Sequence, residues 1–340
     1  MPPLTSRLTI AVDAMSGDHG PGICVPGALE VLREEPALEL VLVGVPADLE
    51  RELKGLSGAE RARVRIEPAS QVVGMDEAPR EAIRRKKDSS LRRAIDLVAD
   101  GRAAACVSSG NTGALMSTAH FVLGMIEGID RPAIVSALPA VGGHTCMLDL
   151  GANSSATAEH LAQFALMGSI VAAELKALPR PKVALLNIGR EDIKGNEIVK
   201  AAHQRLQGST LNYVGYVEGN DICSGVVDVV VTDGFTGNVA LKAMEGIAQM
   251  IAGAVREEFT ANTARSLGAL ASGPALASLR KRLDPRRYNG ASRVGLAGVV
   301  IKSHGSADAT AFAHAIRVGV LEAENGLPAQ IRAQLQQQAA

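Results

Sequence analysis

The stretch VVVTDGFTGNVA at residues 229–240 joins a buried strand to a polar glycine turn and then to a helix. Its three consecutive valines have no polar alternation, which is typical of a central parallel strand covered on both faces. Gly234 and Gly237 carry no side chain that would hold a ligand away from the backbone. A helix beginning near Val239 would direct its free amide groups at the same place. The stretch therefore predicts an anion-binding turn, although an ordinary strand-to-helix turn shares the pattern.

The same construction recurs at five other places along the chain. Each time a short apolar segment runs into a polar turn that contains glycine, at residues 13–20, 108–113, 149–153, 187–196 and 302–306. Ligands of open α/β sheets collect outside the carboxyl ends of the strands. Together these turns therefore predict one shared site.

Length and composition favour a large α/β protein. With 340 residues, 47% of them hydrophobic, the chain can bury a large core. Strand-like segments alternate with helical ones, which predicts a single domain over residues 1–340 or two closely joined domains. The formal net charge of −1 and the absence of tryptophan argue against nucleic-acid binding.

Several motifs are missing from the sequence. The four cysteines include no CxxC pair, so neither a zinc site nor a disulfide framework is expected. The dinucleotide fingerprint, the P-loop, HExxH and the GxSxG elbow do not occur. There is also no secretory signal pattern and no apolar run of membrane-spanning length. We therefore expect a cytoplasmic protein with reduced thiols that works without a metal or a cofactor.

Residues 240–284 break the alternation of strands and helices. Apolar residues recur there at helical spacing on both sides of a break at Gly273 and Pro274, which predicts a helical hairpin that projects from the sheet. Such a face could pack inside the chain, but contact with a second copy in a homodimer is the preferred interpretation. The tip at residues 261–277 is almost uncharged and precedes a basic cluster, so peripheral contact with the inner face of the plasma membrane is also considered.

A second basic cluster includes Arg84, Arg85, Lys86 and Lys87. The default interpretation of such a run is a solvated helix face. Seven cations among residues 80–93 of a nearly neutral protein favour an acidic partner, which would be an acidic protein or a phosphorylated ligand.

Seven segments together resemble a known family, the bacterial phosphate acyltransferases. They are AVDAMSGDHGP (11–21), MDEAPREAIRRKKDSSL (75–91), SSGNTGALM (108–116), LDLGAN (148–153), LLNIGREDIKGN (185–196), VTDGFTGNVALK (231–242) and SHGSADATA (303–311).

The resemblance implies a fold and an activity. The fold would be a three-layer, doubly wound, mostly parallel α/β sheet of the isocitrate-dehydrogenase and phosphotransacetylase type, in a homodimer. The activity would be transfer of a long acyl chain from acyl carrier protein to inorganic phosphate. The acyl phosphate product would pass to a downstream acyl-phosphate:glycerol-3-phosphate acyltransferase.

Three residues depart from the family's usual pattern. Ser16 stands where a glycine is usual, Arg190 where a threonine is usual, and Arg293 in a segment that tends to be apolar. Ser16 puts close backbone approach at that turn in doubt.

The expected chemistry requires a cradle for one phosphate dianion and a donor for one oxyanion. Lys194 is expected to neutralise phosphate or transition-state charge, Asn238 to donate to the oxyanion, and His304 to carry protons. Arg84 to Lys87 are expected to dock the carrier protein. The anion pocket is expected to be lined by Ser109, Gly110, Asn111, Thr112, Gly113, Asp233, Gly234, Thr236, Gly237, Gly305 and Ser306.

Two alternatives from other classes stay open. An NAD-dependent decarboxylating dehydrogenase would share the fold, but it would need a cluster of magnesium-binding aspartates, and the acidic residues are dispersed over separate turns. A non-catalytic phosphate- or lipid-binding protein would need only the pocket and the hairpin.

Overall fold

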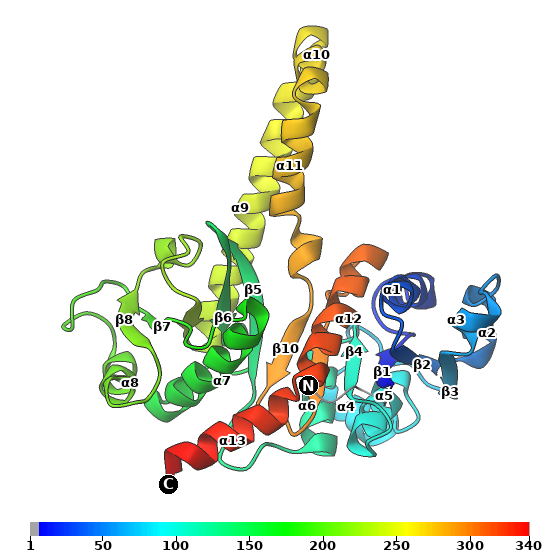
Figure 1. The fold of residues 1–340 in the computed structure, drawn as a ribbon, viewed down its shortest axis with the longest axis horizontal. Coiled ribbons are helices and arrows are strands. Elements are labelled where there is room, and N and C mark those ends of the chain that lie inside the picture. The colour runs from blue at the N-terminus through cyan, green and yellow to red at the C-terminus, as the bar shows by residue number, and fades with distance from the viewer. Residues whose placement is uncertain (1–6, 340) are drawn as a thin grey trace.

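The computed structural model describes residues 7–339 and has one continuous sheet with helices on both faces (Figure 1). The 11 strands lie in the order β3-β2-β1-β4-β11-β10-β5-β6-β9-β7-β8. The predicted α/β class is confirmed. The strands are β1 (Leu8–Asp13), β2 (Leu38–Gly44), β3 (Val64–Pro68), β4 (Ala105–Ser108), β5 (Ala133–Ala140), β6 (Gly143–Leu148), β7 (Val183–Leu186), β8 (Tyr213–Val217), β9 (Val229–Val231), β10 (Ala291–Val294) and β11 (Val299–Lys302).

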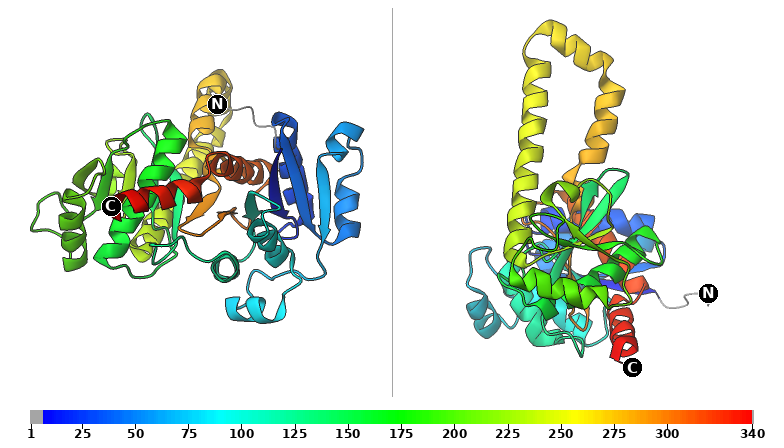
Figure 2. Two further views of the ribbon diagram at one scale, coloured as in Figure 1. Left: turned by 60° about the horizontal axis from the view of Figure 1, so that its bottom comes forward. Right: turned by 90° about the vertical axis from the view of Figure 1, so that its left-hand side faces the viewer.

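Helices fill most connections between these strands, though not those between β5 and β6 or between β10 and β11, and two helices follow β11 (Figure 2). They are α1 (Pro21–Glu34), α2 (Pro46–Glu52), α3 (Gly58–Arg61), α4 (Pro79–Arg85), α5 (Ser90–Ala99), α6 (Thr112–Leu123), α7 (Ala158–Lys176), α8 (Glu197–Gln207), α9 (Gly234–Thr260), α10 (Thr263–Ala271), α11 (Gly273–Leu283), α12 (Ala309–Glu324) and α13 (Leu327–Ala339), with the 3₁₀ turns η1 (Gly219–Asp221) and η2 (Pro285–Tyr288).

Strand alternation assigns the helices to the two faces of the sheet. Ile10 and Val12 of β1 pack with α1 and α12 on one face, whereas Ala11 packs with α5 and α6 on the other. In the second half of the sheet, α7 covers the first of these faces and the base of α9 covers the second. Both faces of the central strands are therefore buried, as the valine-rich sequences predict.

The strands of the two halves run in opposite directions. β3, β2, β1, β4 and β11 are parallel, and so are β6, β9, β7 and β8. Between the halves, β11 with β10, β10 with β5, and β5 with β6 are all antiparallel. An odd number of reversals puts the carboxyl ends of β1, β4 and β11 at one edge of the sheet. The carboxyl ends of β6, β7 and β9 lie at the opposite edge, so the prediction that all the turns share one end of the sheet is wrong.

The predicted helical hairpin projects from the sheet (Figures 1 and 2). α9 rises out of the body of the protein, and α10 and α11 return the chain to it. Near its base, Leu241 and Met244 pack against the buried side chains of the second half. Within residues 7–339 no helix combines the length and the apolar character needed to cross a membrane.

Candidate functional site

The turns after β1, β4 and β11 meet at Gly17. Its backbone has a φ of +78°, and a Cβ there would lie 2.6 Å from Ser109 Oγ and 2.9 Å from Gly305 O. Beside it, Ser16 Oγ accepts a hydrogen bond from Ser109 N at 3.0 Å and donates to Asp13 O at 2.7 Å. The unusual Ser16 is therefore buried and links two turns by hydrogen bonds. The close approach of the backbone to Ser109 and Gly305 depends on Gly17.

Asn111 is used by the fold in a way that the sequence did not predict. Its side chain caps α6 by accepting from Ala114 N at 2.9 Å. Its amide group donates to Met75 O at 2.8 Å and to Glu77 O at 2.9 Å. Asn111 therefore fastens the segment before α4 to the start of α6, and its predicted place in the anion pocket is not supported. The neighbouring Thr112 is exposed at the start of the helix.

His304 and its neighbours form the turn after β11. His304 is exposed, its backbone N–H donates to Asn289 Oδ1 at 2.9 Å, and its Nδ1 accepts from Ser306 N at 3.3 Å. Met75 reaches over the turn, because a Cβ on Gly305 would lie 2.7 Å from the methyl carbon of Met75. The segment fastened by Asn111 therefore covers this turn.

The second group of turns centres on Asp149. This fully buried carboxylate accepts hydrogen bonds from the backbone N–H groups of Ile134, Gly151, Ala152 and Asn153. A Cβ on Gly237 would lie 1.9 Å from Asp149 O, and a Cβ on Gly234 would lie 2.5 Å from Asn153 O. Both glycines are buried, so they permit close packing of α9 against the Asp149 turn instead of lining an open pocket.

The start of α9 differs from the prediction. The helix begins at Gly234, not near Val239, because Asp233 is its N-cap. Asp233 Oδ1 accepts from Thr236 N at 2.9 Å, and Asp233 Oδ2 accepts from the Thr236 hydroxyl at 2.7 Å. Asp233 and Thr236 are therefore occupied in capping, and Asn238 lies one turn inside the helix.

Lys194 and Asn238 lie at the same edge of the sheet, in the segments after β7 and β9. Both are exposed, and within residues 7–339 neither side chain makes a hydrogen bond or an ion pair. Asn238 faces Gly151, whose Cβ position would be 3.7 Å from its Oδ1. The Lys194 turn is held by Arg190, another departure from the family pattern. Its Nη2 donates to both carboxylate oxygens of Asp221 at 2.9 Å.

Two cations, the partly buried Lys302 and the buried Arg293, link the two groups of turns. Lys302 Nζ donates to Ser109 O at 3.3 Å and to Ser303 O, and Arg293 lies beside it on the neighbouring β10. Arg293 also interacts electrostatically with Asp149. Because β10 has only four residues, about 13 Å of strand separates the two edges here. The sequence analysis did not include Lys302 among the site residues. Its position directly after a run of apolar strand residues is the signal that could have indicated it.

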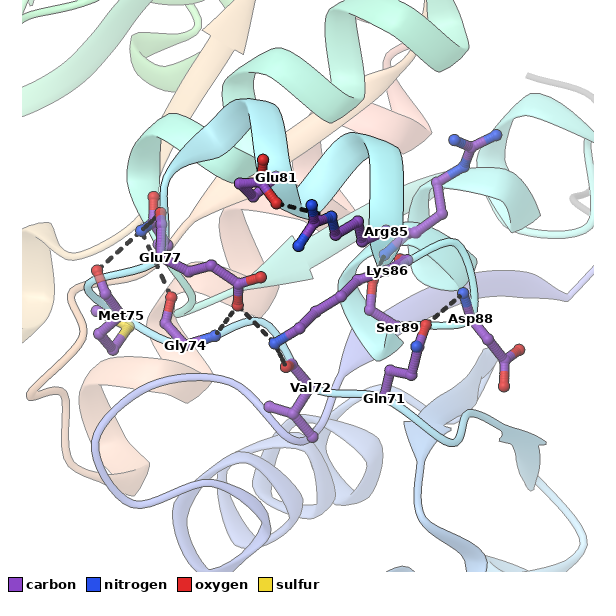
Figure 3. Close-up of polar contacts among 12 residues, drawn as sticks. Gln71, Val72, Gly74, Met75, Glu77, Glu81, Arg85, Lys86, Asp88 and Ser89 are labelled. Atoms are coloured by element: carbon purple, nitrogen blue, oxygen red, sulfur yellow. Dashed lines mark hydrogen bonds and ion pairs between the residues drawn. The ribbon is translucent and has the colours of Figure 1, made fainter.

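The predicted docking residues are not equivalent (Figure 3). Arg84, Arg85 and Lys87 are exposed, and Arg85 pairs with Glu81 at 3.0 Å. Lys86 instead turns inward, where Nζ donates to Val72 O at 2.6 Å and to Glu77 Oε2. Its ammonium group holds the loop before α4, so Lys86 does not belong to the exposed basic surface. The hydrogen bond from Lys86 lowers the pKa of the Glu77 carboxyl.

Comparisons with known proteins agree with one another. The family model described as fatty acid synthesis protein matches residues 8–330. A phosphate acyltransferase of Nitrosococcus oceani is 56% identical over 333 residues, with 97% of each chain covered. A phosphate acyltransferase of Alkalilimnicola ehrlichii is 54% identical, over 98% of this chain and 97% of the relative.

Solved structures are similar in fold at low sequence identity. A phosphotransacetylase from Streptococcus pyogenes matches with a TM-score of 0.64 and 16% identity, covering 94% of both chains. A phosphotransacetylase from Staphylococcus aureus has a TM-score of 0.60 and 14% identity, covering 93% of this chain and 94% of that one. These likenesses confirm the expected fold type. The high identity to phosphate acyltransferases decides against the dehydrogenase and the non-catalytic alternatives. The chain therefore belongs to the fatty acid synthesis protein family and is an acyltransferase of the phosphate acyltransferase kind.

Proposed function

We propose that this acyltransferase moves a long-chain fatty acyl group from the thioester of acyl carrier protein to inorganic phosphate. The product is an acyl phosphate, which a downstream acyl-phosphate:glycerol-3-phosphate acyltransferase consumes in phospholipid synthesis. The name shared by the relatives supports phosphate as the acceptor. The observation that carries the proposal is the pair Lys194 and Asn238, two uncommitted donors at one edge of the sheet.

The reaction defines what these donors do. A phosphate oxygen attacks the thioester carbonyl carbon, negative charge grows on the carbonyl oxygen, and a thiolate leaves. Lys194 supplies positive charge to the phosphate, and the Asn238 amide donates to the oxyanion; no hydrogen bond from another described residue competes for either side chain.

The opposite edge suits the thioester. The exposed Arg84, Arg85 and Lys87 lie on or directly after α4, and a Cβ on Gly113 would lie 2.7 Å from Cγ of Pro79 at the start of that helix. An acidic carrier protein docked on α4 would therefore deliver its acyl group beside the turns after β4 and β11. Thr112, Gly305 and Ser306 line that side, and His304 is a candidate proton carrier there.

The chain works as one domain, and its helical hairpin binds a second copy of the chain in a homodimer. On α9 the apolar residues Ile247, Met250, Ile251 and Val255 recur at helical spacing, and all are exposed in the single chain. Contiguous exposed apolar surface of this kind marks an interaction site. At the tip, Leu267 and Leu270 are 64% and 77% exposed, which supports peripheral contact with a membrane. Of the basic cluster after the tip, the side chains of 280–282 and 287 lie outside the described residues.

One assay tests the proposed reaction. Purified protein is incubated with acyl carrier protein thioester, with and without phosphate, and free carrier thiol and acyl phosphate are measured. Thiol release that requires phosphate, matched by an equal amount of acyl phosphate, is the expected result. Equal release without phosphate would identify a thioesterase and refute the proposal. Charge reversal on α4, considered below, tests the carrier as the donor.

A further inference from the structure

Arg293 is a buried cation to which no described residue supplies a hydrogen-bonded partner of opposite charge. Its side chain is 3% exposed, and its Nε and Nη1 atoms have no hydrogen-bond partner among the described residues. The opposing charge that acts on it is Asp149, which already accepts backbone hydrogen bonds. Burying a charge without such a partner is costly. Its neighbour Ser292, on the opposite face of β10, is by contrast hydrogen-bonded to Glu322 at 2.8 Å.

Arg293 acts electrostatically on Lys302. Ala291 pairs with Lys302 in the sheet, and Arg293 projects from the same face of β10 two residues further on. The charged groups facing the Lys302 ammonium are Arg293, which repels it, and Asp13 and Asp18, which attract it. Burial, reinforced by Arg293, lowers the pKa of Lys302 to about 8. His304, two residues after Lys302, is hydrogen-bonded to Ser306.

Lys302 lies on the side of the site that receives the thioester in the function proposed above. Its Nζ contacts Ser109 O, in the turn before α6, and Ser303 O, in the turn before His304. Asn111 and Met75 join these two turns to the segment that leads into α4. A carrier protein on α4 would therefore present its sulfur to this edge, while Lys194 and Asn238 approach from the other.

We propose that Lys302 is the acid that protonates the leaving thiolate and that Arg293 is the positioning residue that makes this proton available. This inference rests on the proposed function. Phosphate forms the new C–O bond, the C–S bond breaks, and its electron pair stays on sulfur. The Lys302 ammonium gives its proton to that sulfur and regains one from the hydroxyl of the newly acylated phosphate. Hydrogen phosphate and thioester thus yield acyl phosphate and thiol, without gain or loss of protons.

The proton affinities of the two partners are matched. An alkyl thiol has a pKa of about 8.5, taking the cysteine side chain as the reference. Lys302, with its pKa lowered to about 8, can exchange a proton with such a thiolate in either direction. An ordinary exposed lysine holds its proton too tightly for this role, so the burial of Lys302 and the added repulsion from Arg293 both matter.

The decisive experiment varies the leaving group. With an alkyl thioester of acyl carrier protein, Lys302→Met is expected to lower kcat by about 10²- to 10⁴-fold, as for loss of a general acid. With an aryl thioester, whose thiolate departs without a proton, the same variant should lose much less activity. Equal losses on both substrates would overturn the assignment. Failure of the wild-type protein to acylate phosphate from either substrate would instead refute the proposed function.

A second experiment measures the role of Arg293 without using catalysis. Acetylation of lysines by limiting acetic anhydride at a series of pH values, read by mass spectrometry, gives the pKa of Lys302, with the exposed Lys54 as the internal reference. In wild-type protein Lys302 should titrate well below Lys54, and Arg293→Leu should move it upward. Arg293→Lys, which keeps the charge, should leave it low. Lys302 titrating together with Lys54 in the wild type would overturn the inference.

The pH dependence of kcat connects the two results. Only the ammonium form of Lys302 donates, so activity should fall as pH rises through about 8. Removing the Arg293 charge lets Lys302 hold its proton to higher pH, and Arg293→Leu should shift this decline upward. If Arg293→Leu only raises KM for phosphate, the two cations bind phosphate and the proton-transfer role is wrong. Loss of the alkaline decline in His304→Gln would assign the acid to His304.

Discussion

Single glycines on α9 have opposite energetic roles. Gly237 touches the backbone of the Asp149 turn, whereas a Cβ on Gly253 would meet nothing within 4 Å. Gly237→Ala must displace a backbone carbonyl, so it should lower the free energy of unfolding by about 1–3 kcal/mol. Gly253→Ala should raise it by roughly 0.5–1 kcal/mol, because alanine loses less conformational entropy in a helix. Chemical denaturation of both variants checks the sign of each change, and a neutral Gly237→Ala would contradict the close packing.

Glu322 predicts a dependence of stability on pH. Burial raises the pKa of its carboxyl from 4.5 to about 8, although Ser292 donates a hydrogen bond to it. The folded state therefore binds more protons than the unfolded state between these values. The contribution to stability is fully present below pH 4.5 and is lost as pH rises through 8.

Glu322→Gln should remove this dependence. The variant should exceed the wild type in unfolding free energy at pH 8 by roughly a few kcal/mol, and should differ little from it at pH 5. Glu324→Gln, an exposed position on the same helix, is the matched control and should follow the wild-type profile. Denaturation curves from pH 5 to 8 measure the difference, and parallel profiles for wild type and Glu322→Gln would exclude a buried, protonated carboxyl.

At the scale of secondary-structure elements, the hairpin predicts an oligomer. Ile251 is 50% exposed on a long helix, beside other apolar residues. If that face meets a second copy, Ile251→Asp buries an unpaired charge and should yield monomers or aggregates in analytical ultracentrifugation. Gln249→Asp, on the other side of the helix, should leave the dimer intact.

The hairpin tip separates dimer contact from membrane contact. Leu267→Asp and Leu270→Asp should preserve the dimer and reduce binding to vesicles of anionic phospholipid. If Ile251→Asp still forms the dimer, the dimer interface lies elsewhere on the protein. If both tip variants still bind vesicles, the tip is not a membrane contact.

The basic surface of α4 predicts a salt-dependent affinity for the carrier protein. Reversing Arg84, Arg85 and Lys87 to glutamate should raise KM for acyl carrier protein steeply and remove its salt sensitivity, with KM for phosphate little changed. Reversal of Arg33 and Lys54, which are exposed and distant in sequence, serves as the control. An unchanged KM would mean that the α4 residues form an ordinary solvated face.

At the scale of the whole molecule, the proposed reaction requires the donors near β7 and β9 to act on one substrate. Lys194→Ala should lower kcat and weaken phosphate binding together, because a cation stabilises both the bound and the reacting phosphate. Asn238→Ala should lower kcat by about 10²- to 10³-fold while KM for phosphate stays nearly constant. Lys200→Ala on α8 is the matched control. Near-normal kcat in Asn238→Ala would assign the oxyanion to backbone donors, since Asp233 already caps α9.

Local sequence determined much of this protein. Valine runs marked the central strands, because burial on both faces removes the need for alternation. Glycine-bearing turns marked the ends of those strands, and apolar periodicity marked the hairpin. Resemblance in seven segments supplied the family, which the similarity to phosphate acyltransferases confirmed.

Only the tertiary structure decided how these parts are placed. The direction of a strand is set by its neighbours in the sheet, and β10, with Ser292 and Arg293 among its four residues, carries no strand pattern of its own. Without β10 the reversal between the halves cannot be inferred, and the polar turns appear to share one end of the sheet. The same holds for Gly237, whose contact with Asp149 is far away in sequence, and for Lys302, whose pKa is lowered by burial and then by an arginine from another strand. Periodicity reports the environment along one element, whereas strand direction, close backbone contact and charge coupling depend on which distant elements become neighbours.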